Sequence, residues 1–132
     1  MNLTSASPLS FAAVGVGAAL GAWLRWGLAA TLGTAHDRIQ VGTLAANLGG
    51  GYLSGLALGL FAGHPDVAPA WRLFIITGFL GGLTTFSTFS AEAMVLLQRG
   101  QYGWAIMHAM LHLAGSIVCC IAGYATWRAL SP

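Results

Sequence analysis

The stretch GFLGGLTTFSTFSAE, residues 78–92, begins like an apolar membrane segment and then changes character. Two adjacent glycines are followed by five hydroxyl side chains and two phenylalanines. Glycine lowers helix stability by up to about 1 kcal/mol per residue, and a threonine can cap the helix that follows. The pattern therefore predicts a helix that breaks between Gly81 and Thr84 and restarts with Thr84 or Thr85 as its cap.

The rest of the sequence has the composition of a protein embedded in lipid. Of its 132 residues, 57% are hydrophobic and only 6% are charged, with a mean hydropathy of +0.76. A globular soluble domain carries about 25% charged residues. The chain has no lysine and a formal net charge of only +2, which argues against nucleic acid as a partner. The composition indicates an integral membrane protein.

Four apolar stretches have the length of membrane spans, which need about 20 residues each. They cover residues 11–32, 41–62, 71–97 and 102–128. The first lacks the basic start of a secretory signal peptide and has too long an apolar run for one. Glycines four residues apart, such as Gly17 with Gly21 and Gly55 with Gly59, predict close helix packing. We expect one all-α membrane domain over residues 1–132, with four transmembrane helices and the third one broken.

The arginines give this domain almost no preferred orientation. Four spans place Arg72 and Arg128 on one side of the membrane and Arg38 and Arg99 on the other, so the positive-inside rule is close to a tie. Such a chain can insert both ways, which makes an antiparallel homodimer possible, although few charges also produce a tie by chance. One bundle of four helices has little room for a substrate path, so transport would require a second copy.

Residues after the predicted break allow two interpretations. Phe86 and Phe89 share one helix face, while Ser87, Ser90 and Thr88 form a neighbouring polar stripe. Phenylalanines at this spacing commonly pack against lipid or a core. Ring edges beside hydroxyl groups also offer hydrogen-bonding partners to an anion without a fixed positive charge. Broken backbone in a bilayer needs a partner, so the break implies either a site or a glycine kink healed by threonine hydroxyls.

Polar residues in the other spans repeat at helical spacing. Two such faces are present, one in each of the second and fourth spans: Thr43, Asn47 and Ser54, then His108, His112 and Ser116. The histidine pair has a metal-ligand spacing, but no carboxylate or cysteine is clearly placed to complete a site. A hydrogen-bonding stripe or plain helix packing explains it as well. Glu92 is the one acid within a span and is a candidate functional residue, unless it pairs with an interfacial arginine.

The segments GTLAANLGGGYL (residues 42–53) and GFLGGLTTFSTFSAE, together with the length and the four-span plan, resemble the Fluc (CrcB) family of bacterial fluoride channels. The resemblance runs from end to end. It implies a passive, fluoride-selective channel in the plasma (inner) membrane, not an enzyme, that exports cytoplasmic fluoride and confers resistance to it. It also implies an antiparallel homodimer with dual topology and two pores.

The resemblance assigns roles to individual residues. Phe86 and Phe89 match pore phenylalanines whose ring edges face fluoride, and Asn47 matches a pore donor. Further residues of the implied fluoride pathway are Thr43, Ser87, Thr88, Ser90, His108 and Ser116. His108 stands where relatives often carry a tyrosine. Arg25 and Glu92 match vestibule residues. The backbone carbonyls of Gly81 and Thr84, from both subunits, would hold a central structural sodium ion.

Two other classes of function remain as alternatives. A small four-helix proton-coupled multidrug exporter depends on a carboxylate within its first span, where this chain has Arg25. A subunit that only assists assembly would leave the predicted break and the polar faces without a role.

The arginine tie leads to a test of topology. Two lysines added to the loop QRGQ, residues 98–101, should fix one orientation and lower fluoride flux, because only one of the two required orientations is then made. Flux should return when an oppositely biased copy is coexpressed. Full activity of the single biased protein would contradict the antiparallel arrangement.

Overall fold

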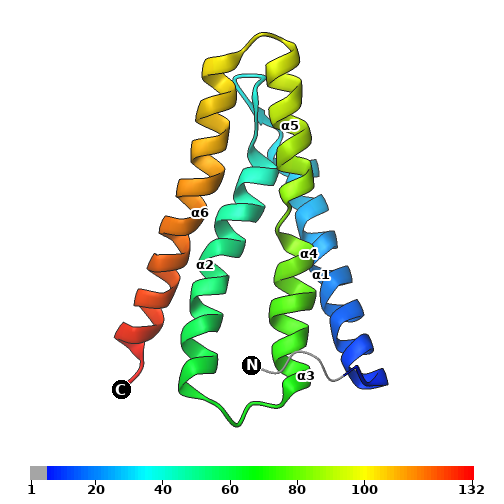
Figure 1. Ribbon diagram of the computed structural model, residues 1–132, viewed down its shortest axis with the longest axis vertical. Coiled ribbons are helices and arrows are strands. Elements are labelled where there is room, and N and C mark those ends of the chain that lie inside the picture. The colour runs from blue at the N-terminus through cyan, green and yellow to red at the C-terminus, as the bar shows by residue number, and fades with distance from the viewer. Residues whose placement is uncertain (1–5) are drawn as a thin grey trace.

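The computed structural model describes residues 6–132, so the first five residues of the predicted domain lie outside the described part. Long helices run side by side along the molecule, and the third is made of several segments (Figure 1). In chain order the elements are α1 (Pro8–Leu32), β1 (Thr34–Ala35), β2 (Ile39–Gln40), α2 (Val41–Gly63), α3 (Pro69–Arg72), η1 (Leu73–Leu80), α4 (Gly81–Leu83), α5 (Phe86–Gln98) and α6 (Tyr102–Leu130).

The predicted all-α membrane architecture is confirmed. Within residues 6–132, four helical stretches are long and apolar enough to cross a membrane, judged by length and composition. They are Pro8–Leu32, Val41–Gly63, Pro69–Gln98 and Tyr102–Leu130. Both ends of each predicted span lie within three residues of the ends of the corresponding helix. Hydropathy located the spans because lipid-facing residues dominate every helix.

Local sequence explains where the helices begin and end. Pro8 opens α1, and the Ser7 hydroxyl in front of it accepts a hydrogen bond from the Ser10 amide at 3.1 Å. Gly33 ends α1 with a φ of 62°, and Gly100 ends the turn after α5 with a φ of 68°. Residues with a side chain rarely adopt such positive φ angles. A short antiparallel hairpin, β1 and β2, follows α1 and pairs Ala35 with Ile39. The sequence analysis expected only a turn there.

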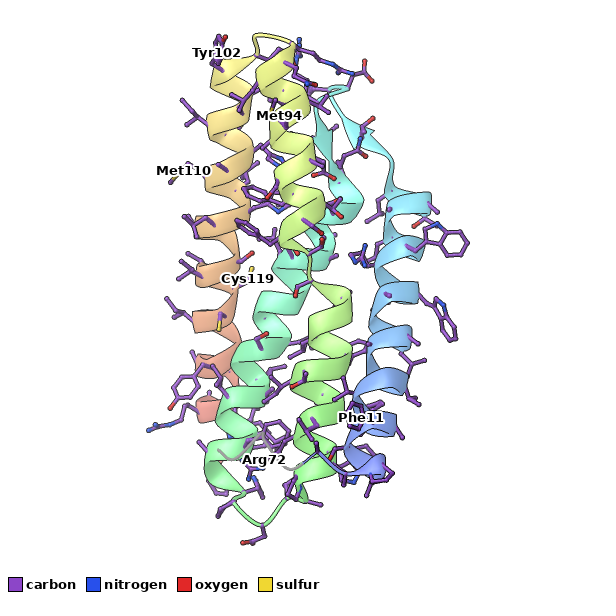
Figure 2. All side chains as sticks on the ribbon, turned by 45° about the vertical axis from the view of Figure 1, so that its right-hand side comes forward. Phe11, Arg72, Met94, Tyr102, Met110 and Cys119 are labelled. Carbon is purple, nitrogen blue, oxygen red and sulfur yellow. The ribbon has the colours of Figure 1, made fainter. Side chains whose placement is uncertain are left out.

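The two ends of the bundle carry the connections predicted for them. The start of α1, the C-terminus and the loop between α2 and α3 lie at one end, and the hairpin and the α5–α6 turn lie at the other (Figure 1). Arg72 lies at the first of these ends (Figure 2) and donates to the carbonyls of His64 and Pro65 at 3.0 Å. Arg38 in the hairpin lies 5.0 Å from the Trp104 ring. The structure therefore places arginines at both ends.

Glycines allow the helix backbones to touch, as predicted. A Cβ atom added to Gly55 would overlap the Cys120 carbonyl on α6, and one added to Gly21 would overlap the Phe79 carbonyl on η1. At Gly51 the added atom would lie 2.7 Å from the Ser116 carbonyl. These contacts join α2 to α6 and α1 to the third helix without side chains between them.

Large apolar side chains cover the outside of the bundle. Phe11 and Met110 project from it (Figure 2) and are 73% and 56% exposed. A small buried core of Ala57, Phe61 and Leu80 lies inside. An outer surface of this kind suits lipid or another protein chain rather than water.

The glycine contacts predict a position-specific loss of stability. Gly55→Val should lower the free energy of unfolding in detergent by about 1–3 kcal/mol or more, because its side chain would collide with the α6 backbone. Gly15→Val on α1 is the matched control, since the described structure leaves the space within 4 Å of its Cβ free. Unfolding followed by circular dichroism measures both. Equal stabilities of the two variants would contradict the packing role of Gly55.

Candidate functional site

The third helix breaks at Thr84 and Thr85. Both residues are extended, with φ and ψ of −81° and 153° for Thr84 and −149° and 122° for Thr85. The break is therefore confirmed, and it lies after Gly81, which remains helical with φ of −63°. Close packing against α1 explains why residue 82 is a glycine, because a Cβ there would lie 3.0 Å from Ala18 Cα. A Cβ at Gly81 would meet only the Ile76 carbonyl, at 3.8 Å.

Asn47 on α2 replaces the hydrogen bonds that the helix loses at the break. Its Oδ1 accepts from the Thr85 amide at 2.8 Å, and its Nδ2 donates to the Thr85 carbonyl at 3.0 Å. The Thr85 hydroxyl accepts from the Thr88 amide at 3.1 Å and so caps α5, as predicted. One side-chain amide and one hydroxyl thus hold the restart of the helix.

These contacts divert hydrogen-bond donors from two particular carbonyls. In an unbroken helix the Thr85 amide would bond the Gly81 carbonyl, and the Thr88 amide would bond the Thr84 carbonyl. Arg25 Nε donates to the Gly82 carbonyl at 3.1 Å, and the Thr84 hydroxyl donates to the Leu80 carbonyl at 2.8 Å. The Leu80 carbonyl also keeps its helical donor, the Thr84 amide, at 3.0 Å, so the threonine hydroxyl adds a second bond there and does not heal a freed carbonyl. The Gly81 and Thr84 carbonyls are thus among those that lose their helical donors at the break.

The hydroxyl groups of the opening stretch bond mostly within their own segment. The Thr85 hydroxyl lies 3.1 Å from that of Thr88 and 3.3 Å from that of Ser87. The Ser90 hydroxyl donates to the Phe86 carbonyl at 2.8 Å. Their part in an ion pathway stays a prediction.

A cavity of about 430 Å³ lies beside the break. Four residues of the predicted pathway line it: Asn47, Phe86, Phe89 and Ser116. The other lining residues are Gly51, Ser54, Thr84, Thr85, Ala109, His112, Leu113 and Ile117. Thr43, His108 and the hydroxyl residues Ser87, Thr88 and Ser90 lie outside this lining. The Phe86 ring is 80% exposed and lies 5.4 Å from the Phe89 ring.

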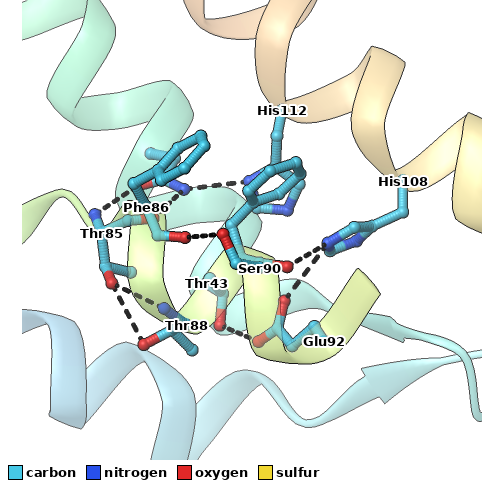
Figure 3. Close-up of polar contacts among 10 residues, drawn as sticks. Thr43, Thr85, Phe86, Thr88, Ser90, Glu92, His108 and His112 are labelled. Carbon is cyan, nitrogen blue, oxygen red and sulfur yellow. Dashed lines mark hydrogen bonds and ion pairs between the residues drawn. The ribbon is translucent and has the colours of Figure 1, made fainter. Parts of the chain in front are cut away.

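Beyond Phe89 the predicted polar faces meet in a buried cluster (Figure 3). The Glu92 carboxylate accepts from the Thr43 hydroxyl at 2.5 Å, and its Oε2 lies 3.7 Å from His108 Nε2. The His108 ring is fully buried and stacks on the Phe89 ring, with centroids 5.0 Å apart and planes 9° apart. Within residues 6–132 the ion-pair partner of Glu92 is thus His108, and the suggested pairing with an arginine is wrong.

His112 is one of the polar lining residues that the sequence did not assign to the pathway. It lines the cavity, and its Nδ1 lies 2.9 Å from Asn47 Nδ2. Since Nδ2 has only hydrogens to give, it donates and His112 accepts. The signal that could have found it was its position midway between His108 and Ser116 on one face of α6. Arg25 contacts the break through Gly82, and its vestibule role stays a prediction.

Four membrane-length helices, one of them broken beside a cavity lined by both polar and apolar residues, define a small multi-pass membrane protein with a polar site between its helices. A family model described as "CrcB-like protein, Camphor Resistance (CrcB)" matches residues 12–124. The chain belongs to this CrcB family, which confirms the resemblance noted in its sequence.

Curated relatives match almost the whole chain. A protein of Cupriavidus pinatubonensis named "Fluoride-specific ion channel FluC" is 57% identical over 124 residues, which are 94% of this chain and 98% of the relative. Proteins of the same name from Pseudomonas putida and Aromatoleum aromaticum are 51% and 53% identical. Those alignments cover 92% and 91% of this chain and 96% and 92% of the relatives. These relatives are named as ion channels, not as enzymes.

Proposed function

We propose that this protein is a passive fluoride-selective channel of the bacterial plasma membrane that exports cytoplasmic fluoride, and is not an enzyme. The observation that carries the proposal is the cavity at the break. Within the described structure its lining has amide, hydroxyl, imidazole and aromatic groups and no arginine, aspartate or glutamate. The names of the relatives support fluoride as the ion.

The chemistry of the lining suits a small, strongly hydrated anion. A selective path must replace the water around fluoride with close donors, yet release the ion at the far end. Neutral donors and the positive edges of phenylalanine rings attract an anion without holding it as tightly as a fixed charge would. Hydrogen fluoride enters cells as a neutral acid and dissociates inside. The membrane potential, at about 2.3 kcal/mol per charge per 100 mV, then drives the anion out.

The proposal includes an antiparallel homodimer with two pores and dual topology. Phe86 lines the cavity yet is 80% exposed, so one chain leaves that wall open. A second copy would close it. The two ends of the bundle also carry similar charge, with Arg72 and Arg128 at one and Arg38 and Arg99 at the other, which suits insertion in both directions.

A structural sodium ion completes the proposed dimer. The Gly81 and Thr84 carbonyls lose their helical donors at the break. If two copies meet there, two carbonyls from each would surround one point with oxygen atoms that carry no formal charge. Such ligands suit a hard monovalent cation better than a divalent one. The ion would neutralise carbonyl dipoles that otherwise face one another in a medium of low dielectric constant.

Purified protein in liposomes tests the function. The wild type should release loaded fluoride rapidly when the potential is collapsed with a potassium ionophore. Asn47→Asp and Phe86→Ile should each reduce the flux at least about tenfold, because one adds negative charge to the cavity and the other removes a ring edge. Phe11→Ile on the outer face of α1 is the matched control. Near-normal flux in both site variants would mean that Asn47 and Phe86 only pack in the structure and do not line an ion path. Proton exchange driven by a drug would indicate the multidrug exporter instead.

Gly81→Val tests the sodium site. The single chain has room for the side chain, since the added Cβ lies 3.8 Å from its nearest neighbour and φ is −63°. The variant should therefore fold like the wild type but lose fluoride flux, because the side chain would crowd an ion on the dimer axis. Gly55→Val is no suitable comparison, because its side chain collides with the α6 backbone within one chain. Gly15→Val serves as control. Unchanged flux in Gly81→Val would contradict the sodium site. So would a wild-type flux that does not change when a bulky organic cation replaces sodium.

A further inference from the structure

Glu92, His108 and His112 form a cluster of potential metal ligands that the proposed channel does not require. One carboxylate oxygen and one nitrogen from each histidine lie within 4.8 Å of one another. His108 and His112 are four residues apart on α6, and α5 brings Glu92 beside them. His108 and His112 are 0% and 5% exposed. A buried site of this kind joins two segments of the chain.

Each member of the cluster has a buried polar atom without a hydrogen-bond partner. Within residues 6–132, Glu92 Oε2, His108 Nδ1 and His112 Nε2 are buried and make no hydrogen bond. Native proteins leave few such atoms unpaired, and an ion or a water commonly explains those that remain. Three unpaired atoms on three neighbouring residues therefore point to a bound species.

The chemistry of these atoms selects its class. We propose that Glu92, His108 and His112 bind a divalent transition-metal ion of the zinc type. Two imidazole nitrogens and one carboxylate oxygen are a ligand set that zinc accepts, with a fourth position left for water or an anion. Calcium and magnesium prefer oxygen ligands alone. Tetrahedral ligation places ligand atoms roughly 3.3 Å apart, so the rings must rotate slightly to close around the ion.

Neighbouring residues already orient two of the three ligands. The Thr43 hydroxyl donates to Glu92 Oε1 at 2.5 Å, which leaves Oε2 directed at His108 (Figure 3). His108 Nε2 lies 3.2 Å from the Phe89 carbonyl and 3.7 Å from Glu92 Oε2, so this nitrogen faces the carboxylate. Ligation through Nε2 leaves the ring proton on Nδ1.

Asn47 competes with the metal ion for the third ligand, His112, through a hydrogen bond. Its amide orientation is fixed because Oδ1 accepts from the Thr85 amide at 2.8 Å. Nδ2 therefore donates to His112 Nδ1 at 2.9 Å, and the proton of neutral His112 lies on Nε2. Ligation through Nε2 moves this proton to Nδ1 and breaks the bond from Asn47. Metal binding and the Asn47–His112 hydrogen bond are thus mutually exclusive.

Titration of the purified full-length protein with Zn²⁺ by calorimetry, and with Co²⁺ by visible absorption, tests the site. The wild type should bind one ion per chain saturably, with the strong d–d bands of tetrahedral Co²⁺. His108→Gln, His112→Gln and Glu92→Gln should each weaken binding at least about tenfold. His36→Gln and His64→Gln, at exposed histidines of the loops, are matched controls and should bind as the wild type does. Absence of saturable binding, or binding that survives His108→Gln and His112→Gln together, would overturn the proposal.

Asn47→Asp distinguishes Zn²⁺ bound at His112 from Zn²⁺ bound elsewhere on the protein surface. A carboxylate at position 47 can accept the Nδ1 proton of His112, so it removes the competition and should tighten Zn²⁺ binding about tenfold or more. Combined with His112→Gln, the same change should have no effect on affinity. An equal gain in the combined variant would mean that the new carboxylate binds the ion itself, and would overturn the role given to His112.

Fluoride flux gives a second readout, which alone rests on the proposed channel function. His112 lines the cavity and Phe89 contacts both histidines, so Zn²⁺ in the cluster should slow fluoride efflux from liposomes, and His108→Gln should relieve the block. Saturable binding to a protein that conducts no fluoride at all supports the metal site and refutes the channel. Fast efflux that Zn²⁺ leaves unchanged, with binding intact, supports the metal site and places it outside the ion path.

Discussion

The hydrogen bonds between the Asn47 side chain and the Thr85 backbone are the interaction on which the site depends. A bilayer offers no water to an open backbone, so a helix can break there only if other groups take the freed bonds. A primary amide has a donor and an acceptor side by side, as a peptide group does, and Asn47 uses both on Thr85. The cavity beside the break exists because this pairing holds two extended residues in the middle of a membrane helix.

The same constraint keeps positive charge out of the cavity. Arg25 donates to the Gly82 carbonyl at the end of the first half of the third helix, where the helix dipole favours a cation. It does not belong to the cavity lining. An arginine within a span is costly unless it has such a partner. The break therefore supplies the carbonyl that holds Arg25, while the lining beside it keeps neutral donors.

Sequence predicted those features that local composition or spacing determines. Hydropathy located the helices, Thr85 was one of two expected caps, and glycine spacing indicated the contact at Gly55. Features that depend on tertiary neighbours were not predictable. Asn47 and Thr85 are 38 positions apart, and nothing local in Leu73–Leu80 distinguishes its π-helical winding from an α-helix. The different roles of Gly81 and Gly82 appear only when Ala18 of α1 is in place.

Stacking on the histidines also restricts the orientation of the Phe89 ring at the cavity. The Phe89 ring lies parallel to His108, and His112 tilts against it at 47°. Ring faces carry partial negative charge and ring edges partial positive charge. His108 covers one face of the Phe89 ring, which leaves the other face and the ring edge for other contacts, and the edge has the polarity that the proposed anion path requires. His108 thus contacts a ring that lines the cavity, and a change at His108 should act on the proposed anion path through the orientation of Phe89.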